Sequence, residues 1–171
     1  MIKKQILLLI FFTAVIAFSE TTSEIKLGAK IPRFGGTTLG DQKWITSKKW
    51  ADSSFVMAIS FGASWCVPCR MELPFLDSMS RKNPNMRSLA ILTDEKPDKL
   101  KSFISQLELN MPVLHDVGAI FSTRFGVGSS LPFLILVDKK GIVRSVSTGF
   151  DNIHKDSIKT QIMGLLQEGV E

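Results

Sequence analysis

The sequence predicts an α/β sandwich with a mixed central sheet, and three observations lead to this fold class. Two short runs, 54–61 and 87–93, are almost continuously apolar, which is typical of strands buried on both faces of a sheet. A helical pattern follows each run, as expected when crossover helices join parallel strands. Near the end of the chain, a hairpin pattern adds antiparallel pairing.

The segment before the first apolar run predicts an N-terminal extension of the sandwich. Ile31-Pro32-Arg33-Phe34 favours an extended edge piece, because proline cannot donate a hydrogen bond to a central ladder. Gly40-Asp41 is typical of a turn and leads to Trp44. We assign Trp44 and Trp50 to core or surface packing.

Helices and strands alternate through the middle of the chain. A helix is predicted over 67–82, between the two apolar runs. Pro97 suits the first position of a second helix, and apolar residues follow it at helical spacing. Val113-Leu114 predicts a short strand, and residues 119–125 predict a short helix. The stretch from Pro97 to Leu114 thus predicts a helix followed by a short strand.

The end of the chain predicts a hairpin and a closing helix. Residues 133–137 and 142–147 flank Asp138-Lys139-Lys140-Gly141, which has the composition of a tight turn. Apolar residues at helical spacing from Ile158 to Leu165 mark the last helix. The predicted order is βαβαβαββα after the extension, which gives a three-layer α/β sandwich.

The first residues have the features of a signal peptide. Lys3 and Lys4 give a basic start, and residues 6–18 form an apolar run too short for the about 20 residues that span a bilayer. We expect 1–19 to be a signal peptide and 20–171 to be one extracytoplasmic domain of a bacterial protein. The alternative is an uncleaved membrane tether through residues 6–18. No cysteine stands directly after the run, which excludes a bacterial lipoprotein anchor.

Composition limits the classes of partner. The formal net charge is +5, but the lysines and arginines are scattered, so no nucleic-acid footprint is present. The chain has only two cysteines, Cys66 and Cys69, and a disulfide that closes so short a loop removes little chain entropy. A domain of this size can rely on its own core. The pair is therefore explained by chemistry, and we expect a monomer with no metal and no cofactor.

Cys66 and Cys69 lie where a buried strand gives way to a helix. The Cys66 sulfur should therefore be exposed beside unpaired backbone N–H groups and the positive end of the helix dipole, which can lower a thiol pKa from about 8.5 to roughly 3.5–7.5. Cys69, one turn along, should face the interior. Pro68 is tolerated there because the first turn has no N–H bond to lose.

Two other interpretations of the cysteine pair are open. A structural zinc site needs about four ligands, but His115 and His154 lie far apart in sequence and have no partner at ligand spacing. We expect His115 at a strand end and His154 in solvent on the last helix. A purely structural disulfide is the second alternative.

Three segments carry a resemblance to a known family. Phe61-Gly62-Ala63-Ser64-Trp65-Cys66-Val67-Pro68-Cys69-Arg70-Met71-Glu72-Leu73-Pro74 resembles the active-site segment of the thioredoxin superfamily, and in detail the extracytoplasmic TlpA/ResA-like branch. Residues 131–141 resemble the cis-proline strand and hairpin of that family, and Pro97 to Leu114 resembles the insert of the branch. The resemblance covers roughly Ile25 to the C-terminus and implies a thioredoxin-like fold.

The resemblance also implies substrate contacts. It places Pro132, in a cis bond after Leu131, beside the Cys66 sulfur, where it helps to hold the substrate backbone. Trp65 should form a hydrophobic lip next to Cys66. We therefore expect the substrate-binding residues to be Trp65, Pro68, Leu131 and Pro132.

Glu72 is the candidate acid–base residue. Its helical neighbours three and four positions away are Pro68, Cys69, Phe75 and Leu76, and none of them can pair with a carboxylate. We expect Glu72 to project from the apolar side near Cys69, with a pKa raised by desolvation. The TlpA/ResA-like branch has a functional glutamate at the matching position. The alternative is a carboxylate that reaches solvent near the helix start.

The polar side of the same helix carries Arg70, Asp77 and Arg81, and the last two suit a surface pair four residues apart. Two positions depart from thioredoxin itself. Ser60 stands where thioredoxins hold a buried aspartate, and Gly62 replaces the usual first tryptophan. Both changes move the acid–base role onto Glu72, although Gly62 could equally mark a wider groove.

The predicted reaction is thiol–disulfide exchange with a protein substrate. The Cys66 thiolate attacks a substrate disulfide, and Cys69 resolves the mixed disulfide. Val67-Pro68 lacks the histidine of strongly oxidising relatives, which favours a reductase that a membrane thiol donor recharges, as in cytochrome c maturation or general periplasmic reduction. The alternatives are an oxidase or isomerase, a thiol peroxidase (though Ile59 and Ala63 stand where it would need Pro and Thr), and a non-enzymatic binding or chaperone module.

Overall fold

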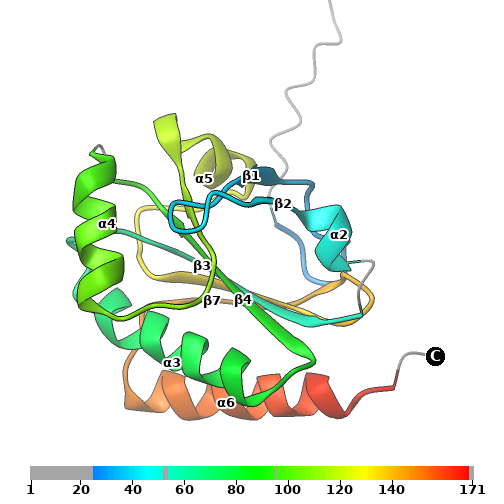
Figure 1. The fold of residues 1–171 in the computed structure, drawn as a ribbon. Helices are drawn as coiled ribbons and strands as arrows, with labels where there is room; N and C mark the ends of the chain where they lie inside the picture. Colours follow the sequence, from blue (N-terminus) through cyan, green and yellow to red (C-terminus); the bar gives the residue numbers. More distant parts are fainter. Residues whose placement is uncertain (1–24, 52–53, 95, 170–171) are drawn as a thin grey trace, which may run out of the picture.

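The computed structural model describes residues 25–51, 54–94 and 96–169. The expected signal peptide or tether lies outside these residues. The central sheet has five strands in the order β5-β4-β3-β6-β7, and a two-stranded sheet, β1-β2, lies beside it (Figure 1). The strands are β1 (Gly35–Thr37), β2 (Trp44–Thr46), β3 (Val56–Gly62), β4 (Met86–Leu92), β5 (Val113–His115), β6 (Phe133–Val137) and β7 (Val143–Thr148).

The helices follow the predicted order. They are α2 (Ser47–Ala51), α3 (Cys69–Lys82), α4 (Pro97–Gln106), the 3-10 turn η1 (Val117–Ala119), α5 (Ile120–Arg124) and α6 (Asn152–Gln167). β3, β4 and β5 pair in parallel, whereas β6 runs antiparallel to β3 and β7. The mixed sheet and the thioredoxin-like three-layer arrangement predicted from the sequence are therefore confirmed. α2 was not predicted.

Two apolar layers hold the sheet between its helices. α3 and α6 lie side by side on one face (Figure 1), where Leu76 and Met79 pack with Ile158 and Ile162. The N-terminal extension, α2 and α5 cover the other face with a second cluster that includes Phe34, Ile45, Trp50 and Phe125. Every residue of β3 is buried, as its continuous apolar run predicts. β3 is thus a rigid base for the segment that follows it.

The β6–β7 hairpin forms through its turn residues. Oδ1 of Asp138 accepts hydrogen bonds from the backbone N–H groups of Lys140 and Ile142, both at 2.9 Å. Gly141 has a φ of 75°, which other residues rarely adopt. Asp138 and Gly141 therefore fix the hairpin expected from the sequence.

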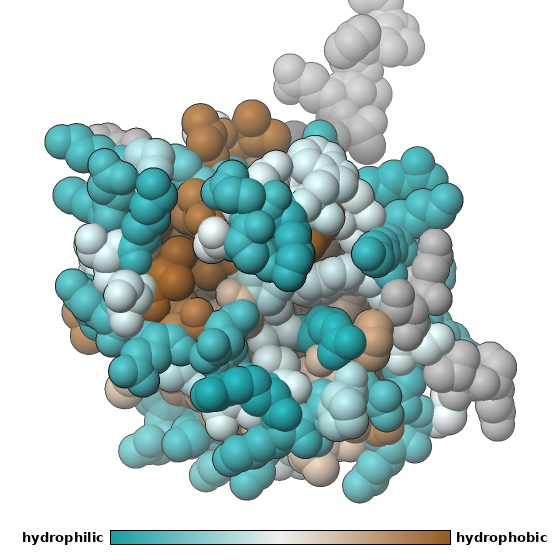
Figure 2. Space-filling view, in the orientation of Figure 1, coloured by the Kyte–Doolittle hydropathy of each residue, from teal (hydrophilic) through white to brown (hydrophobic). Residues whose placement is uncertain are grey.

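The surface is mostly hydrophilic, with one apolar region in view. Figure 2 shows hydrophobic surface over the η1–α5 segment and between α4 and the β1–β2 turn. Val117 and Ile120 are exposed in that segment. No helix in the part of the chain that the structure describes is both long and apolar enough to cross a membrane.

Candidate active site

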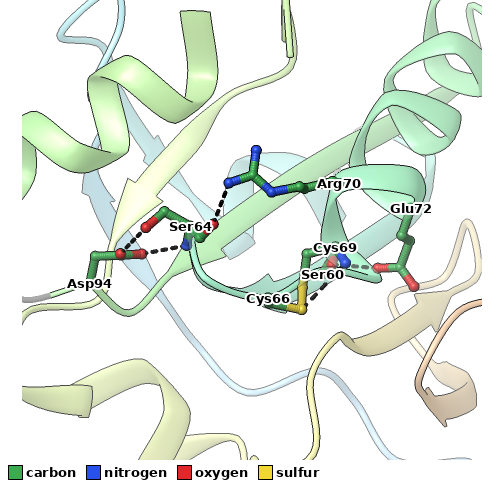
Figure 3. The surroundings of a disulfide bond; sticks show 7 residues. All are labelled: Ser60, Ser64, Cys66, Cys69, Arg70, Glu72 and Asp94. Atoms are coloured by element: carbon green, nitrogen blue, oxygen red, sulfur yellow. Dashed lines mark hydrogen bonds between the residues drawn. A yellow bond between two sulfur atoms is a disulfide. The ribbon is translucent and has the colours of Figure 1, made fainter. Parts of the chain in front are cut away.

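The two cysteines lie at the carboxyl end of β3 and the start of α3. They are joined by a disulfide (Figure 3), and the backbone N–H of Cys69 donates a hydrogen bond to Sγ of Cys66 at 3.3 Å. This contact places the Cys66 sulfur against the amino end of the helix, as predicted. The helix starts two residues later than expected, because Pro68 occupies the capping position before Cys69.

Both cysteines are buried in this disulfide form. The exposed fraction is 4% for Cys66 and 0% for Cys69. The prediction of an exposed Cys66 sulfur is therefore wrong for the disulfide form, since the sulfur packs against the helix start. Trp65 and Val67 next to it are exposed by 67% and 70%, which leaves a hydrophobic lip in solvent as expected for Trp65.

Glu72 lies on the buried side of α3 and is fully covered. The hydroxyl of Ser60 on β3 donates a hydrogen bond to Oε1 of Glu72 at 2.5 Å, and Oε2 has no partner among the described residues. Burial raises the pKa of Glu72 to about 7, although the Ser60 hydrogen bond and the charge of His154 act in the opposite direction. The structure thus places Glu72 as predicted, and the alternative of a carboxylate in solvent is wrong.

Gly62 lies against Cys69. A Cβ atom at this position would lie 3.0 Å from Sγ of Cys69 and 3.4 Å from Cδ2 of Leu92. Cys69 therefore occupies the space that a side chain would need. Gly62 therefore makes room for Cys69, and the interpretation of Gly62 as the mark of a wider groove stays a prediction.

The Leu131–Pro132 peptide bond is cis, as the resemblance implied. The carbonyl of Pro132 accepts a hydrogen bond from the backbone N–H of Gly149 at 2.9 Å, which holds the start of β6 in place. Leu131 packs against the apolar cluster that contains both cysteines. Pro68 is half-buried at the start of α3. Their contacts with a substrate stay a prediction.

A carboxylate that the sequence analysis missed holds the loop before Cys66. Asp94 accepts two hydrogen bonds from Ser64, one from the backbone N–H at 2.8 Å and one from the hydroxyl (Figure 3). From the other side, Nη2 of Arg70 donates to the Ser64 carbonyl at 2.9 Å. β3 and β4 are parallel neighbours, so Ser64 and Asp94 leave the sheet at the same edge. Ser64 and Asp94 are polar and stand at equivalent positions after two parallel strands. This pattern in the sequence could have predicted the contact.

The remaining polar candidates are an ion pair on α3 and two histidines. Asp77 does pair with Arg81, at a distance of 3.3 Å. The expectation of a surface pair is wrong for Asp77, because α3 packs this turn against the sheet and buries the carboxylate.

His115 ends β5, as expected, and its Nε2 lies 2.6 Å from the Asp94 carbonyl. His154 is on α6 but half-buried, with Nδ1 2.7 Å from Asp151. Within 25–51, 54–94 and 96–169, no group of His, Cys, Asp and Glu could hold a metal ion.

Comparisons with known proteins agree with this geometry. A family model described as Redoxin matches residues 26–162. Thiol-disulfide oxidoreductase ResA of Bacillus anthracis is 28% identical over 159 residues, which is 92% of this chain and 86% of the relative. Thioredoxin-like protein YneN of Bacillus subtilis (strain 168) is 26% identical over 136 residues, or 77% of each chain.

A solved structure from Chlorobium tepidum, assigned by its description to thiol:disulfide interchange protein DsbE, superposes with a TM-score of 0.76. It is 26% identical in sequence, and the match covers 84% of this chain and 99% of that chain. The fold and the cysteine pair thus agree with the sequence relationships. The chain belongs to the Redoxin family of the thioredoxin superfamily and is a thiol–disulfide oxidoreductase of the ResA/DsbE type, with Cys66 and Cys69 as its redox pair.

Proposed function

We propose that the protein is an extracytoplasmic reductase of protein disulfides. The observation that carries the direction is the pair Val67-Pro68 between the cysteines, because no histidine stands there to stabilise a thiolate further and raise the potential. The basic and apolar start of the chain supports export, with 1–19 as a signal peptide or residues 6–18 as a tether. The folded domain then spans 20–171.

In this proposal the Cys66 thiolate attacks one sulfur of a substrate disulfide and releases the other as a thiolate. Cys69 then attacks Cys66 in the mixed disulfide, which releases the reduced substrate and leaves the Cys66–Cys69 disulfide. Glu72 accepts the Cys69 proton as that thiol becomes a nucleophile. A pKa of about 7 suits this role near neutral pH.

The oxidised protein must regain two electrons, and an oxidising compartment does not supply them. We therefore propose a membrane thiol donor as the second partner. The resemblance of the active-site segment to the TlpA/ResA-like branch supports a place in cytochrome c maturation or in general periplasmic reduction. Trp65, Pro68, Leu131 and Pro132 contact the substrate in this proposal.

The redox potential tests the direction. We expect equilibration against glutathione to give a potential below about −200 mV, well on the reducing side of the roughly −120 mV of strong disulfide oxidants. Cys66 and Cys69 should change redox state together, as a two-electron couple. A potential near the latter value would identify an oxidase with the same residues instead.

A further inference from the structure

Two depressions lie side by side along α4, and one of them is lined by Trp65. One has a volume of about 330 Å³ and is lined by Trp65, Thr93, Asp94, Lys96 and Lys99. The other has a volume of about 390 Å³, and its lining includes Ser64, Arg70, Asp98, Lys99 and Phe103. Because Lys99 lines both, the two depressions adjoin along α4. We call this surface the α4 groove.

Among the residues that the structure describes, the charged side chains that line the α4 groove are mainly positive. Lys96 and Lys99 are exposed, and Arg70 adds a third cation. The Asp94 carboxylate is buried and accepts two hydrogen bonds from Ser64, so it is not available to a ligand. Asp98 lies 3.6 Å from Lys101, which offsets its charge. The α4 groove therefore suits an anionic group.

The groove is also held in a fixed position relative to the cysteines. Arg70, the residue after Cys69, donates to the Ser64 carbonyl and lies over the ring of Phe103 on α4, 5.1 Å from its centroid. Figure 3 shows Arg70 and Asp94 meeting Ser64 from two sides, close to the disulfide. A chain segment bound along α4 would thus keep a defined distance from Cys66.

We propose that the α4 groove binds the part of a substrate polypeptide that flanks its reacting cysteine, and that it selects acidic residues there. This proposal rests on the proposed function and names the substrate class of the same site. The inserted helix and strand, Pro97 to Leu114, then determine which disulfides the cysteines reach. A charge pair at an exposed surface acts mainly on the rate at which two partners meet and on the choice between partners. A single pair changes the affinity by about two- to fivefold.

Two matched peptides test the proposal. Each carries one cysteine as a mixed disulfide with thionitrobenzoate, flanked either by glutamates or by lysines. The reduced protein attacks the peptide sulfur and releases thionitrobenzoate, and Cys69 then displaces the peptide thiol. Two electrons pass from the protein dithiol to the peptide disulfide, and the released chromophore reports the first step. 2-Hydroxyethyl disulfide, which is uncharged, measures thiol reactivity alone.

The full-length protein is compared with Lys99→Glu and with the matched control Lys159→Glu on α6. We expect the parent to react about fivefold faster with the acidic peptide than with the basic one. This preference should vanish or reverse in Lys99→Glu, persist in Lys159→Glu, and weaken as salt is raised. The parent and Lys159→Glu should reduce 2-hydroxyethyl disulfide at equal rates, and the rate of Lys99→Glu with this uncharged disulfide corrects its peptide rates for any change in thiol reactivity.

Equal rates for both peptides in the parent would overturn the proposal. The same conclusion holds if the preference survives unchanged in Lys99→Glu. In both cases turnover of 2-hydroxyethyl disulfide would show that the proposed reductase activity stands. If the reduced parent protein reacted with none of the three disulfides, the proposed function would fail together with the proposal.

Discussion

Oε1 of Glu72 on α3 accepts a 2.5 Å hydrogen bond from the hydroxyl of Ser60 on β3. Thioredoxins hold a buried carboxylate on the strand itself, whereas here the strand supplies the hydroxyl and the helix supplies the acid. Since Glu72 is fully buried and its pKa is raised to about 7, the carboxyl can give or take a proton at neutral pH. Ser60 keeps it oriented in either state.

The buried carboxyl should make stability depend on pH. The pKa of Glu72 rises from 4.5 to about 7 on folding, so between these values the unfolded chain loses the proton and the folded protein keeps it. The free energy of unfolding should fall by roughly 3 kcal/mol as pH rises through this window. Urea unfolding of the oxidised protein at pH values on either side of the window, about 4.5 and about 8, measures the change.

Glu72→Gln should lack this pH dependence. We expect the difference in unfolding free energy between variant and parent to shift in favour of the variant by roughly 3 kcal/mol across the same pH range. Glu108→Gln, an exposed acid after α4, is the matched control. A constant difference across that range would show that Glu72 titrates at its ordinary pKa.

Glu72 should also influence the thiols. An ionised carboxyl near the sulfurs opposes thiolate formation, so the cysteine pKa values of Glu72→Gln should fall, while resolution of mixed disulfides slows because the proton acceptor is missing. Thiolate absorbance near about 240 nm against pH, with single-turnover exchange, measures both effects. The titrations are coupled, so the apparent pKa values belong to the group. Curves that overlay those of the parent would remove Glu72 from the mechanism.

Cys66 should be the nucleophile. Its sulfur accepts the N–H of Cys69 at the helix start, and Cys66 is the less buried of the two cysteines. In the reduced protein at neutral pH, limiting iodoacetamide should label Cys66 first, and peptide mapping identifies the site. Cys66→Ser should then react much more slowly than Cys69→Ser. Faster labelling of Cys69 would reverse the assignment.

Asp94 should stabilise the loop before Cys66. Asp94→Ala removes both acceptors of Ser64 and leaves a partly buried N–H unpaired, which should lower the free energy of unfolding by about 1–3 kcal/mol. Asp94→Asn keeps one oxygen acceptor for Ser64, so its free energy of unfolding should fall by less. Asp98→Asn on exposed α4 is the control, with no change beyond about 0.5 kcal/mol. Urea unfolding of the three variants makes the comparison, and equal stability of Asp94→Ala and parent would contradict it.

The sequence predicted the parts of this fold that depend on local pattern. The apolar run over 54–61 identified β3, because a strand buried on both faces has no polar side. The turn residues Asp138 and Gly141 identified the hairpin, because their backbone preferences are intrinsic. Local pattern also located the centre of the site. The three-residue spacing of Cys66 and Cys69 and the apolar helical neighbours of Glu72 can both be seen in the sequence without knowledge of the fold.

Contacts between elements were harder to predict. Ser60 and Glu72 meet only because α3 packs on β3, and Asp94 meets Ser64 only because β4 pairs with β3. Asp77 seemed to belong to a surface pair by its spacing from Arg81, but spacing does not show which side of a helix the sheet covers. The five-residue helix α2 is too short to give a periodic signal.

The N-terminal extension crosses the whole sheet and pairs with it at both ends. Lys30 forms an antiparallel bridge with Ile142, just before β7, and Thr38 forms one with Leu114 of β5, so the extension pairs with β5 and with the start of β7. Unpaired outer strands invite strand addition from a second molecule. Where the extension pairs with these edges, a strand of a second molecule cannot add, as suits the monomer expected from the sequence.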